Sequence, residues 1–149
     1  MGRPLSPREV FLALVHGVAE ERWDELPGLY AEQTDVRHPL APGGAPPLLS
    51  RDALREHFGG TGPRVAQAIR FEPDNIRVHE TADPEVIVAE FEYAGTRAAD
   101  GASFRVPCIF VLRVRDGQIV SSRDYFDHLT TARVRGHLDE LLAALTELT

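Results

Sequence analysis

The stretch DGQIVSSRDYFD, residues 116–127, predicts a tight turn followed by a strand. Asp-Gly between two apolar runs is a strong hairpin signal, because glycine adopts the positive φ that such a turn needs. Side chains alternate across a sheet, so the strand should have two distinct faces. One face carries Val120, Ser122, Asp124 and Phe126, and the other carries Ile119, Ser121, Arg123 and Tyr125. Aspartate is depleted in strands, so Asp124 is a carboxylate directed at a ligand if its face lines a cavity.

The composition is that of one soluble globular domain spanning residues 1–149. The 149 residues are 43% hydrophobic and 26% charged, which is enough for a sizeable core. A net charge of -7 repels a phosphate backbone, so nucleic acid is not an expected partner. Cys108 is the one cysteine, which excludes an intrachain disulfide and a cysteine-rich zinc site.

The sequence predicts no targeting or membrane segment. Its N-terminus lacks a basic region followed by an apolar core, so no signal peptide is expected. No apolar run approaches the roughly 20 residues that a membrane helix needs. We therefore expect a cytoplasmic protein without a membrane partner.

Helical patterns dominate the first part of the chain. Ser6, Pro7 and Glu9 form a capping-box signature, and apolar residues then recur at helical spacing. A short second helix is predicted over roughly Trp23–Tyr30. A third helix should begin after Ser50 and end at the glycines of positions 59, 60 and 62. The Pro/Gly-rich stretch 39–47 between these helices predicts a loop.

The hydrophobic period then changes to two, which is typical of strands. The candidate strands are Ile69–His79, Val86–Arg97, Phe104–Arg115 and Gln118–Asp127. Short turns join them, so the sheet should be antiparallel. A last helix, about Thr131–Leu148, places its leucines along one stripe. Helices followed by a long meander predict an α+β fold in which the helices cover one face of the sheet.

Two segments of the chain match a known pattern. The first is WDEL at 23–26 leading to LYA at 29–31, and the second is GQIV at 117–120 leading to RDYFD at 123–127. Together they resemble the nuclear-transport-factor-2-like superfamily, and most of all its SnoaL-like branch, which includes polyketide cyclases. The resemblance covers nearly the whole chain. It implies a cone-shaped, curved, mainly antiparallel sheet wrapped around the N-terminal helices, with a deep apolar pocket. This superfamily hosts isomerases, cyclases, hydrolases, dehydratases and non-catalytic binders on one scaffold.

The last strand also resembles that of limonene-epoxide hydrolases, in which the matching Asp is the catalytic carboxylate. Asp124 occupies that position. Those enzymes carry an Arg and an Asp two residues apart on a preceding strand, where this chain has Glu90 and Glu92. Glu92 keeps a carboxylate, but Glu90 replaces the cation that would polarise an epoxide. The looser cyclase pattern, an acidic residue near the last strand together with polar pocket residues, is met.

Asp124 is the first candidate for acid–base catalysis, with Glu92 and His38 as assistants. An apolar cone disfavours the charged carboxylate, so the pKa of Asp124 should rise towards the range useful to a general acid or base. The alternative is a structural aspartate paired with a nearby Arg or His. The resemblance places His38 near the pocket mouth, where it could exchange protons near neutral pH. Glu90 and Glu92 join Asp124 if their face looks inward, which the family register favours for Glu92, and are solvated charges if it looks outward.

The remaining candidate site residues form an apolar lining or add polar groups to it. They are Trp23, Tyr30, Phe58, Glu90, Phe104, Val106, Cys108, Ser122 and Phe126. Most of them would serve equally well as core. His57 is interpreted as a satisfied core histidine and His128 as a surface or helix-edge group. No cluster has metal-ligand spacing, so neither a metal nor a cofactor is expected.

Two classes of function follow from these residues. The first is an enzyme that performs cofactor-free acid–base cyclisation or isomerisation of a small apolar or aromatic molecule, polyketide-like or terpenoid-like. The second is a non-catalytic dimeric domain that binds a ligand or partner. Epoxide hydrolysis is a further alternative, which needs a cation near Asp124. A homodimer is predicted because Ile109, Val111 and Tyr125 place apolar groups on the outer face of the sheet, and monomers rarely expose a large apolar patch.

Overall fold

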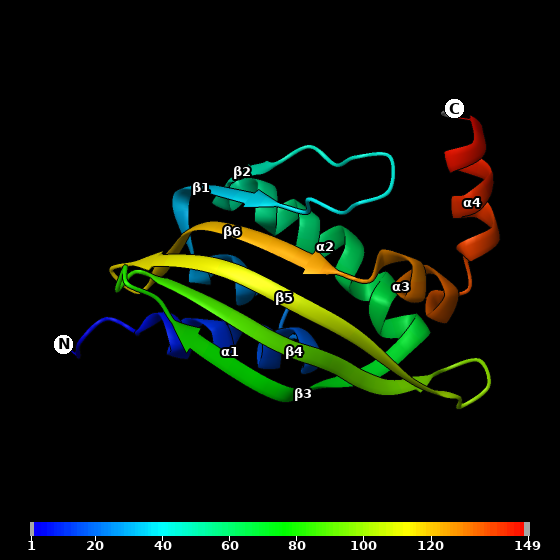
Figure 1. Ribbon diagram of the computed structural model, residues 1–149, viewed down its shortest axis with the longest axis horizontal. Coiled ribbons are helices and arrows are strands. Elements are labelled where there is room, and N and C mark those ends of the chain that lie inside the picture. Colours follow the sequence, from blue (N-terminus) through cyan, green and yellow to red (C-terminus); the bar gives the residue numbers. More distant parts are fainter. Residues whose placement is uncertain (1, 148–149) are drawn as a thin grey trace.

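The computed structural model describes residues 2–147 as a six-stranded sheet with helices packed against one of its faces (Figure 1). In chain order the elements are α1 (Pro7–Ala19), the 3-10 turn η1 (Leu26–Leu29), β1 (Tyr30–Arg37), β2 (Leu48–Ser50), α2 (Arg51–Ala68), β3 (Ile69–Glu80), β4 (Val86–Arg97), β5 (Ser103–Arg115), β6 (Gln118–Phe126), α3 (His128–Arg135) and α4 (Leu138–Glu147). The strand order is β2-β1-β6-β5-β4-β3. All neighbouring strands are antiparallel except β1 and β6, which run parallel. The predicted α+β class with a mainly antiparallel sheet is confirmed.

Helix α1 begins as its sequence predicts and carries one side of the core. The Glu9 amide donates to Ser6 Oγ, and the Ser6 amide donates to the Glu9 carboxylate, which completes the capping box. The helix buries Phe11 against the inner face of the sheet. There its ring meets Phe91 edge to face at 5.2 Å and Phe110 at 6.2 Å between centroids. This aromatic contact fixes α1 across β4 and β5.

Helix α2 does not end at the glycines, as the sequence predicts, but continues to Ala68. The reason is packing against Trp23. A Cβ built on Gly62 would lie 2.5 Å from the indole of Trp23, so only glycine lets the helix approach so closely. Gly62 therefore allows a close contact and does not terminate the helix.

The segment Trp23–Tyr30 contains less helix than the sequence predicts. Only Leu26–Leu29 forms a 3-10 turn, and Tyr30 is the first residue of strand β1. Strand β1 and the short β2 were not predicted, because β1 is mostly polar and lacks an apolar alternation. Its partners come from elsewhere in the chain, since Arg37 lies opposite Arg123 of β6.

Strand β6 follows the predicted hairpin turn but contains one irregularity. Asp116 and Gly117 both have positive φ, 51° and 77°, as a tight hairpin turn requires. Ser121 pairs with Arg113 of β5, and Ile119 pairs with Val114, the next residue of β5. Val120 therefore has no partner opposite it, and the register shifts at this residue. As a result Ile119 is buried in the core, contrary to the simple alternation. Ser122 and Asp124 still point inward, as predicted.

The end of the chain forms two helices where one is predicted over Thr131–Leu148. Gly136 adopts a left-handed φ of 84° after α3 and ends that helix. Helix α4 then runs away from the sheet (Figure 1) and has no buried residue. Leu148 lies outside the described residues.

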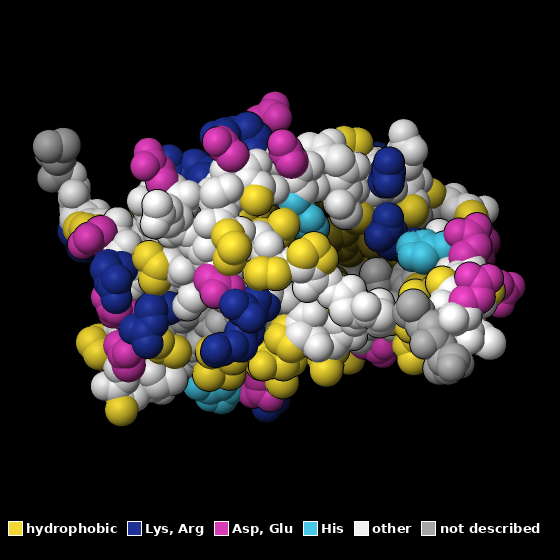
Figure 2. Space-filling model, turned by 90° about the horizontal axis from the view of Figure 1, so that it is seen from above, with side chains coloured by type: hydrophobic (Ala, Val, Ile, Leu, Met, Phe, Trp, Pro, Cys, Tyr) yellow, Lys and Arg dark blue, Asp and Glu magenta, His cyan; other side chains and the backbone are white. Residues whose placement is uncertain are grey.

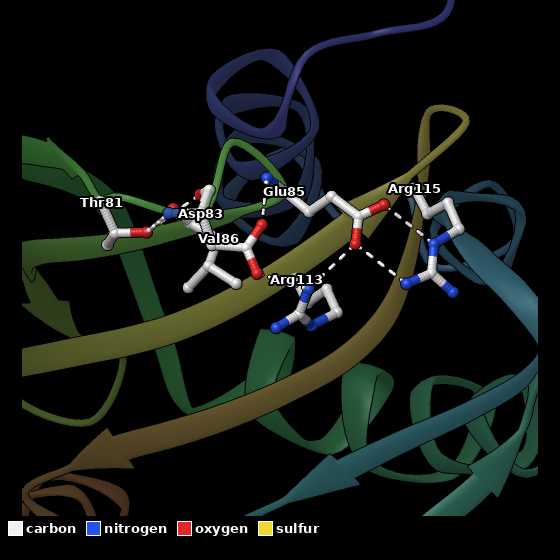
Figure 3. Close-up of polar contacts among 6 residues, drawn as sticks. All are labelled: Thr81, Asp83, Glu85, Val86, Arg113 and Arg115. Atoms are coloured by element: carbon white, nitrogen blue, oxygen red, sulfur yellow. Dashed lines mark hydrogen bonds and ion pairs between the residues drawn. The ribbon is translucent and has the colours of Figure 1, made fainter.

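Ion pairs connect the β3–β4 turn to the neighbouring strand at the end of the sheet (Figure 3). Glu85 accepts hydrogen bonds from Arg113 at 2.9 Å and from Arg115 at 2.8 and 2.9 Å. Asp83 accepts a second hydrogen bond from Arg113 at 2.9 Å, and Thr81 Oγ1 donates to the Val86 carbonyl at 2.9 Å. These contacts hold the register of β4 against β5.

Gly95 provides a test of the sheet. A Cβ at this position would lie 1.8 Å from the backbone oxygen of Arg70 on the adjacent strand, so Gly95→Ala must push β3 and β4 apart. We expect a loss of at least about 2 kcal/mol in the free energy of unfolding, measured by chemical denaturation. The matched control is Gly60→Ala, where nothing lies within 4 Å of the new methyl group. That helical change should stabilise by roughly 0.5–1 kcal/mol. Equal stability of the two variants would contradict the register of β3 and β4.

The predicted homodimer stays a prediction. Ile109 lies on the outer face of β5 and is 41% exposed, next to the half-buried Tyr125 of β6. We expect light scattering at micromolar concentration to give twice the chain mass of 16.5 kDa. Ile109→Arg should shift the mass to that of one chain, whereas Ile109→Leu, which keeps the apolar area, should not. A wild-type mass of one chain would rule out this dimer.

Candidate active site

A pocket of about 380 Å³ lies between the inner face of the sheet and helices α2 and α3. We call it the inner pocket. Figure 2 shows a hollow on this side of the molecule, with hydrophobic side chains inside it and a histidine at its edge. Its walls include six of the predicted lining residues, Trp23, Phe58, Phe104, Val106, Cys108 and Phe126. Asp124 and His38 also line it. A smaller cavity of about 70 Å³ shares these two residues and contains Tyr30.

Asp124 is the buried carboxyl of this pocket. The residue is 7% exposed and points inward from β6. Burial raises the pKa of Asp124 to about 7, because water no longer solvates the charged form, while the hydrogen bond donated by Ser122 Oγ acts in the opposite direction. The carboxyl can therefore gain and lose a proton near neutral pH.

His38 faces Asp124 from the end of β1. Its Nε2 lies 3.8 Å from Oδ2 of Asp124, which is longer than a hydrogen bond. Burial, together with smaller effects of the nearby His57 and His128, lowers the pKa of His38 to about 4. The imidazole is thus neutral at pH 7 and can accept a hydrogen bond from the protonated Asp124 after a small movement or through one water. The sheet register explains why the two side chains meet. Arg37 lies opposite Arg123, and His38 and Asp124 are the residues that directly follow these two arginines.

Two tyrosines surround the carboxyl. Tyr93 lines both cavities and Tyr30 lines the smaller one. Burial raises the pKa of both hydroxyls well above the ordinary value, and the charge of Asp124 raises it further. Both hydroxyls therefore stay protonated and can donate hydrogen bonds. Tyr93 was not among the predicted site residues, although alternation along β4 placed it on the same face as Phe91.

Cys108 occupies the pocket wall as an inert group. Burial, with a smaller contribution from the charge of Asp124, raises the pKa of its thiol to about 12. A thiol with such a pKa is protonated at neutral pH and is not a nucleophile. Cys108 therefore contributes shape and apolar surface only.

Glu90 and Glu92 lie on the outer face of the sheet, so the structure does not bring them to Asp124. Strand β4 alternates without interruption opposite β5, and its inward positions are taken by apolar residues such as Phe91. Glu92 accepts hydrogen bonds from Arg105 at 2.6 Å and from Asn75 at 3.0 Å. Glu90 pairs with His79 at 2.7 Å. The catalytic role predicted for Glu92 and the binding role predicted for Glu90 are corrected by this geometry.

Histidines on two helices enter the site instead. His57 of α2 lies 5.9 Å from His38 between ring centroids, and it lines the pocket. His128, predicted to be superficial, stacks on Phe126 at 3.9 Å and lines the pocket as well. Thr131 and Arg135 follow His128 on the same side of α3, at positions i+3 and i+7. This helical spacing was the sequence signal that could have identified them.

The remaining structural features concern metals and membranes. Among residues 2–147, no three His, Cys, Asp or Glu side chains gather where they could hold a metal ion. No helix in the same range combines the length and the apolar character needed to cross a bilayer.

The pH dependence of stability tests the environment of Asp124. Its native pKa of about 7 is raised above the ordinary 3.8, so the stabilisation it contributes is complete below pH 3.8 and is lost as the pH rises through 7. Asp124→Asn removes this titration. Between about pH 4 and pH 8, wild type should lose up to about 4 kcal/mol of unfolding free energy relative to the variant. Chemical denaturation at each pH measures the difference, and Glu92→Gln on the outer face is the control. A difference that does not change with pH would contradict this assignment.

The comparisons with known proteins agree with this architecture. The family described as SnoaL-like domain matches residues 11–122. The uncharacterized protein YesE of Bacillus subtilis is 28% identical over 126 residues, which cover 85% of this chain and 82% of YesE. The crystal structure of a proposed isomerase from Bacillus subtilis superposes with a TM-score of 0.76 at 23% identity, covering 88% of this chain and 93% of that one. A proposed polyketide cyclase from Xanthomonas campestris has a TM-score of 0.66 at 18% identity, with 87% and 96% covered.

At these identities the two crystal structures establish a shared fold, and the cone-shaped, nuclear-transport-factor-2-like architecture predicted from the sequence is confirmed. The family match begins in α1 and ends in β6, two residues before Asp124. It therefore includes α2 and most of the sheet around the carboxyl, whereas Asp124 itself and α3 lie beyond the matched residues. The chain belongs to the SnoaL-like domain family.

Proposed function

We propose that this protein is a cofactor-free acid–base enzyme that isomerises or cyclises a small apolar molecule of polyketide-like or terpenoid-like character. The observation that carries the proposal is the Asp124 carboxyl, buried in a pocket of mostly apolar walls, with a pKa of about 7 and a neutral imidazole 3.8 Å away. A group with such a pKa is poised between acid and base at neutral pH. Perturbed carboxyls of this kind cluster at functional sites.

The arrangement suits proton transfer next to a carbonyl group. The Asp124 carboxylate would take a proton from the carbon adjacent to the carbonyl, and the electron pair of that C–H bond would move to the carbonyl oxygen to form an enolate. The Tyr93 hydroxyl, which remains protonated, is the donor available to this oxygen. Returning the proton to a different carbon completes an isomerisation. Attack of the enolate carbon on a second carbonyl of the same molecule closes a ring, and the proton then goes to the new alkoxide.

His38 would act as a neutral hydrogen-bonding partner of the carboxyl while the substrate rearranges. Its pKa of about 4 keeps the imidazole unprotonated, so the proton taken from the substrate stays on Asp124, the stronger base with a pKa of about 7, and returns to the substrate from there. Ser122 fixes the orientation of the carboxyl by donating to Oδ1, which leaves Oδ2 towards His38. A fixed carboxyl with one free oxygen is the geometry that general base catalysis needs.

The contacts of Asp124 favour catalysis over a purely structural role. Within residues 2–147 its side chain forms no ion pair with an arginine, and its polar partners are Ser122 and His38. An aspartate kept only for stability would be paired with a cation or donors that hold its charge. The same absence of a cation at Asp124 gives no support to epoxide hydrolysis. The similarity in fold to a proposed isomerase and a proposed polyketide cyclase is in keeping with proton-transfer chemistry.

Asp124→Asn tests the proposal with a carbon acid as probe. We expect wild type to accelerate hydrogen–deuterium exchange at the activated CH₂ of 2-tetralone, followed by NMR in D₂O. The rate should rise with pH and level off above about pH 7, where Asp124 is ionised. Asp124→Asn should lower the enzymatic rate by about 100- to 10,000-fold, because the amide cannot take the proton.

The matched control is Glu92→Gln, which removes a carboxylate from the outer face and should leave the exchange rate unchanged. Exchange at the parent rate in Asp124→Asn would refute the role of Asp124. If wild type does not exceed the buffer rate with 2-tetralone or with open-chain 1,3-diketones, the non-catalytic binding domain becomes the better description.

A further inference from the structure

Helix α3 presents a polar stripe to the mouth of the inner pocket. His128, Thr131 and Arg135 all line the pocket and are spaced by three and four residues, so they occupy one side of the helix. The Thr131 hydroxyl is already used, since it donates to the Asp127 carbonyl at 2.9 Å. His128 and Arg135 differ from Thr131 because each has a nitrogen without a hydrogen bond within the described residues. Neither side chain has a role in the proton transfer described above.

Arg135 and His128 each place a buried nitrogen at this mouth without a protein partner. Nε of Arg135 and Nε2 of His128 are both shielded from solvent, and neither forms a hydrogen bond within the described part of the chain. Burying a donor without an acceptor destabilises the folded chain, and it does so more strongly for a charged group. A second molecule that supplies an acceptor would remove this cost.

The charge at the mouth is also uncompensated. Arg135 forms no ion pair with any residue of 2–147, and neither does the exposed Arg64 of α2. Arg64 is close enough for its charge to act on Arg135. Burial and the charge of Arg64 together lower the pKa of Arg135 from its ordinary value, which is the signature of a destabilised cation. Most arginines of the chain do find carboxylates, as Arg105 and Arg113 show.

This concentration of positive charge is notable in a chain with a net charge of -7. The chain has no lysine, so all dark blue side chains in Figure 2 are arginines, and two of them stand directly beside the hollow. Acidic residues are abundant, yet within residues 2–147 none forms an ion pair with Arg64 or Arg135. An anion bound from solution would satisfy both the unpaired charge and the unpaired nitrogens.

We infer that the inner pocket takes an apolar molecule that carries a carboxylate, whose anionic group binds Arg135 at the mouth while its apolar body extends towards Asp124. This rests on the proposed function, because it assigns the substrate class of the same pocket. A carboxylate matches the planar guanidinium, and a monoanion costs less to desolvate against largely apolar walls than a phosphate dianion. Arg64 attracts the anion from the rim, and Nε2 of neutral His128 can donate a second hydrogen bond.

The two ends of the pocket then have separate tasks. Arg135 forms no ion pair with Asp124, so the anion site and the carboxyl that moves protons are distinct positions. Between them lie apolar side chains, including Phe104, Val106 and Phe126. A ligand held at the mouth would place a carbon of its apolar body near Asp124 and keep its own negative charge away from that carboxyl. Arg135 is therefore a binding residue that sets the orientation of the substrate.

The test compares 2-naphthoate with the neutral isostere 2-naphthamide by isothermal titration calorimetry at pH 6, where Asp124 is largely protonated. Wild type should bind the carboxylate about 10- to 100-fold more tightly than the amide, as expected for a charge-assisted hydrogen bond in a shielded site. Arg135→Gln should abolish this preference and leave amide binding unchanged. Arg133→Gln, which removes an exposed arginine of the same helix, is the matched control and should keep the preference.

A direct readout accompanies the titrations. The NMR signal of the Arg135 Nε–H group should shift when 2-naphthoate is added and stay in place with 2-naphthamide. Unchanged binding of the amide in Arg135→Gln shows that the variant is folded, and Arg135→Lys, which keeps a charge but loses the planar fork, should retain part of the preference.

Three results would overturn the inference. Equal affinity of wild type for the two probes, or an unaltered preference in Arg135→Gln, would eliminate the anion site and leave proton transfer by Asp124 standing. Absence of binding by both probes would eliminate the anion site and also count against the pocket as a ligand site. The exchange assay with 2-tetralone, which is neutral, decides the role of Asp124 independently of these outcomes.

Discussion

The parallel pairing of β1 with β6 is the constraint on which the site depends. It connects a mostly polar N-terminal strand to the last strand of the meander, and the buried Thr34 hydroxyl secures it by donating to the Ile119 carbonyl at 3.0 Å. The register sets Arg37 opposite Arg123, so the next residues, His38 and Asp124, become neighbours. A shift of one residue would turn one of these side chains to the other face and separate the imidazole from the carboxyl.

Carboxylates of this chain show how strongly position decides chemistry. Glu85 is half-buried near the surface and accepts hydrogen bonds from Arg115 and Arg113, which hold its pKa at about 2. Asp124 is buried without a cation, and its pKa is about 7. The first group stays ionised over the whole physiological range and serves the architecture, whereas the second can exchange protons. Glu90 and Glu92 also serve the architecture, because they form hydrogen bonds on the outer face.

The inner pocket contains several polar groups that the fold leaves unsatisfied. A carboxyl without a cation, an arginine without an anion and a buried histidine nitrogen without a partner each cost stability. Outside the pocket most arginines are paired with carboxylates, as Arg113 is, although Nε of Arg97 also lacks a hydrogen bond within the described residues. Departures from complete pairing are expected where a ligand supplies the missing partners. The pocket thus contains polar groups that lower the stability of the fold, set among apolar walls that resemble an ordinary hydrophobic core.

The sequence by itself determined the features that depend on near neighbours. The capping box of Ser6 and Glu9, the Asp116-Gly117 turn and the period-two meander are local patterns, and the inward direction of Asp124 follows from alternation once the turn is placed. Tertiary structure decided what depends on distant partners. Only packing against Trp23 carries α2 through Gly62, and only the β4–β5 pairing turns Glu92 outward. Likewise the anion site needs α3 to fold over the pocket, because Arg135 gains its burial and its neighbour Arg64 from an element far away in the chain.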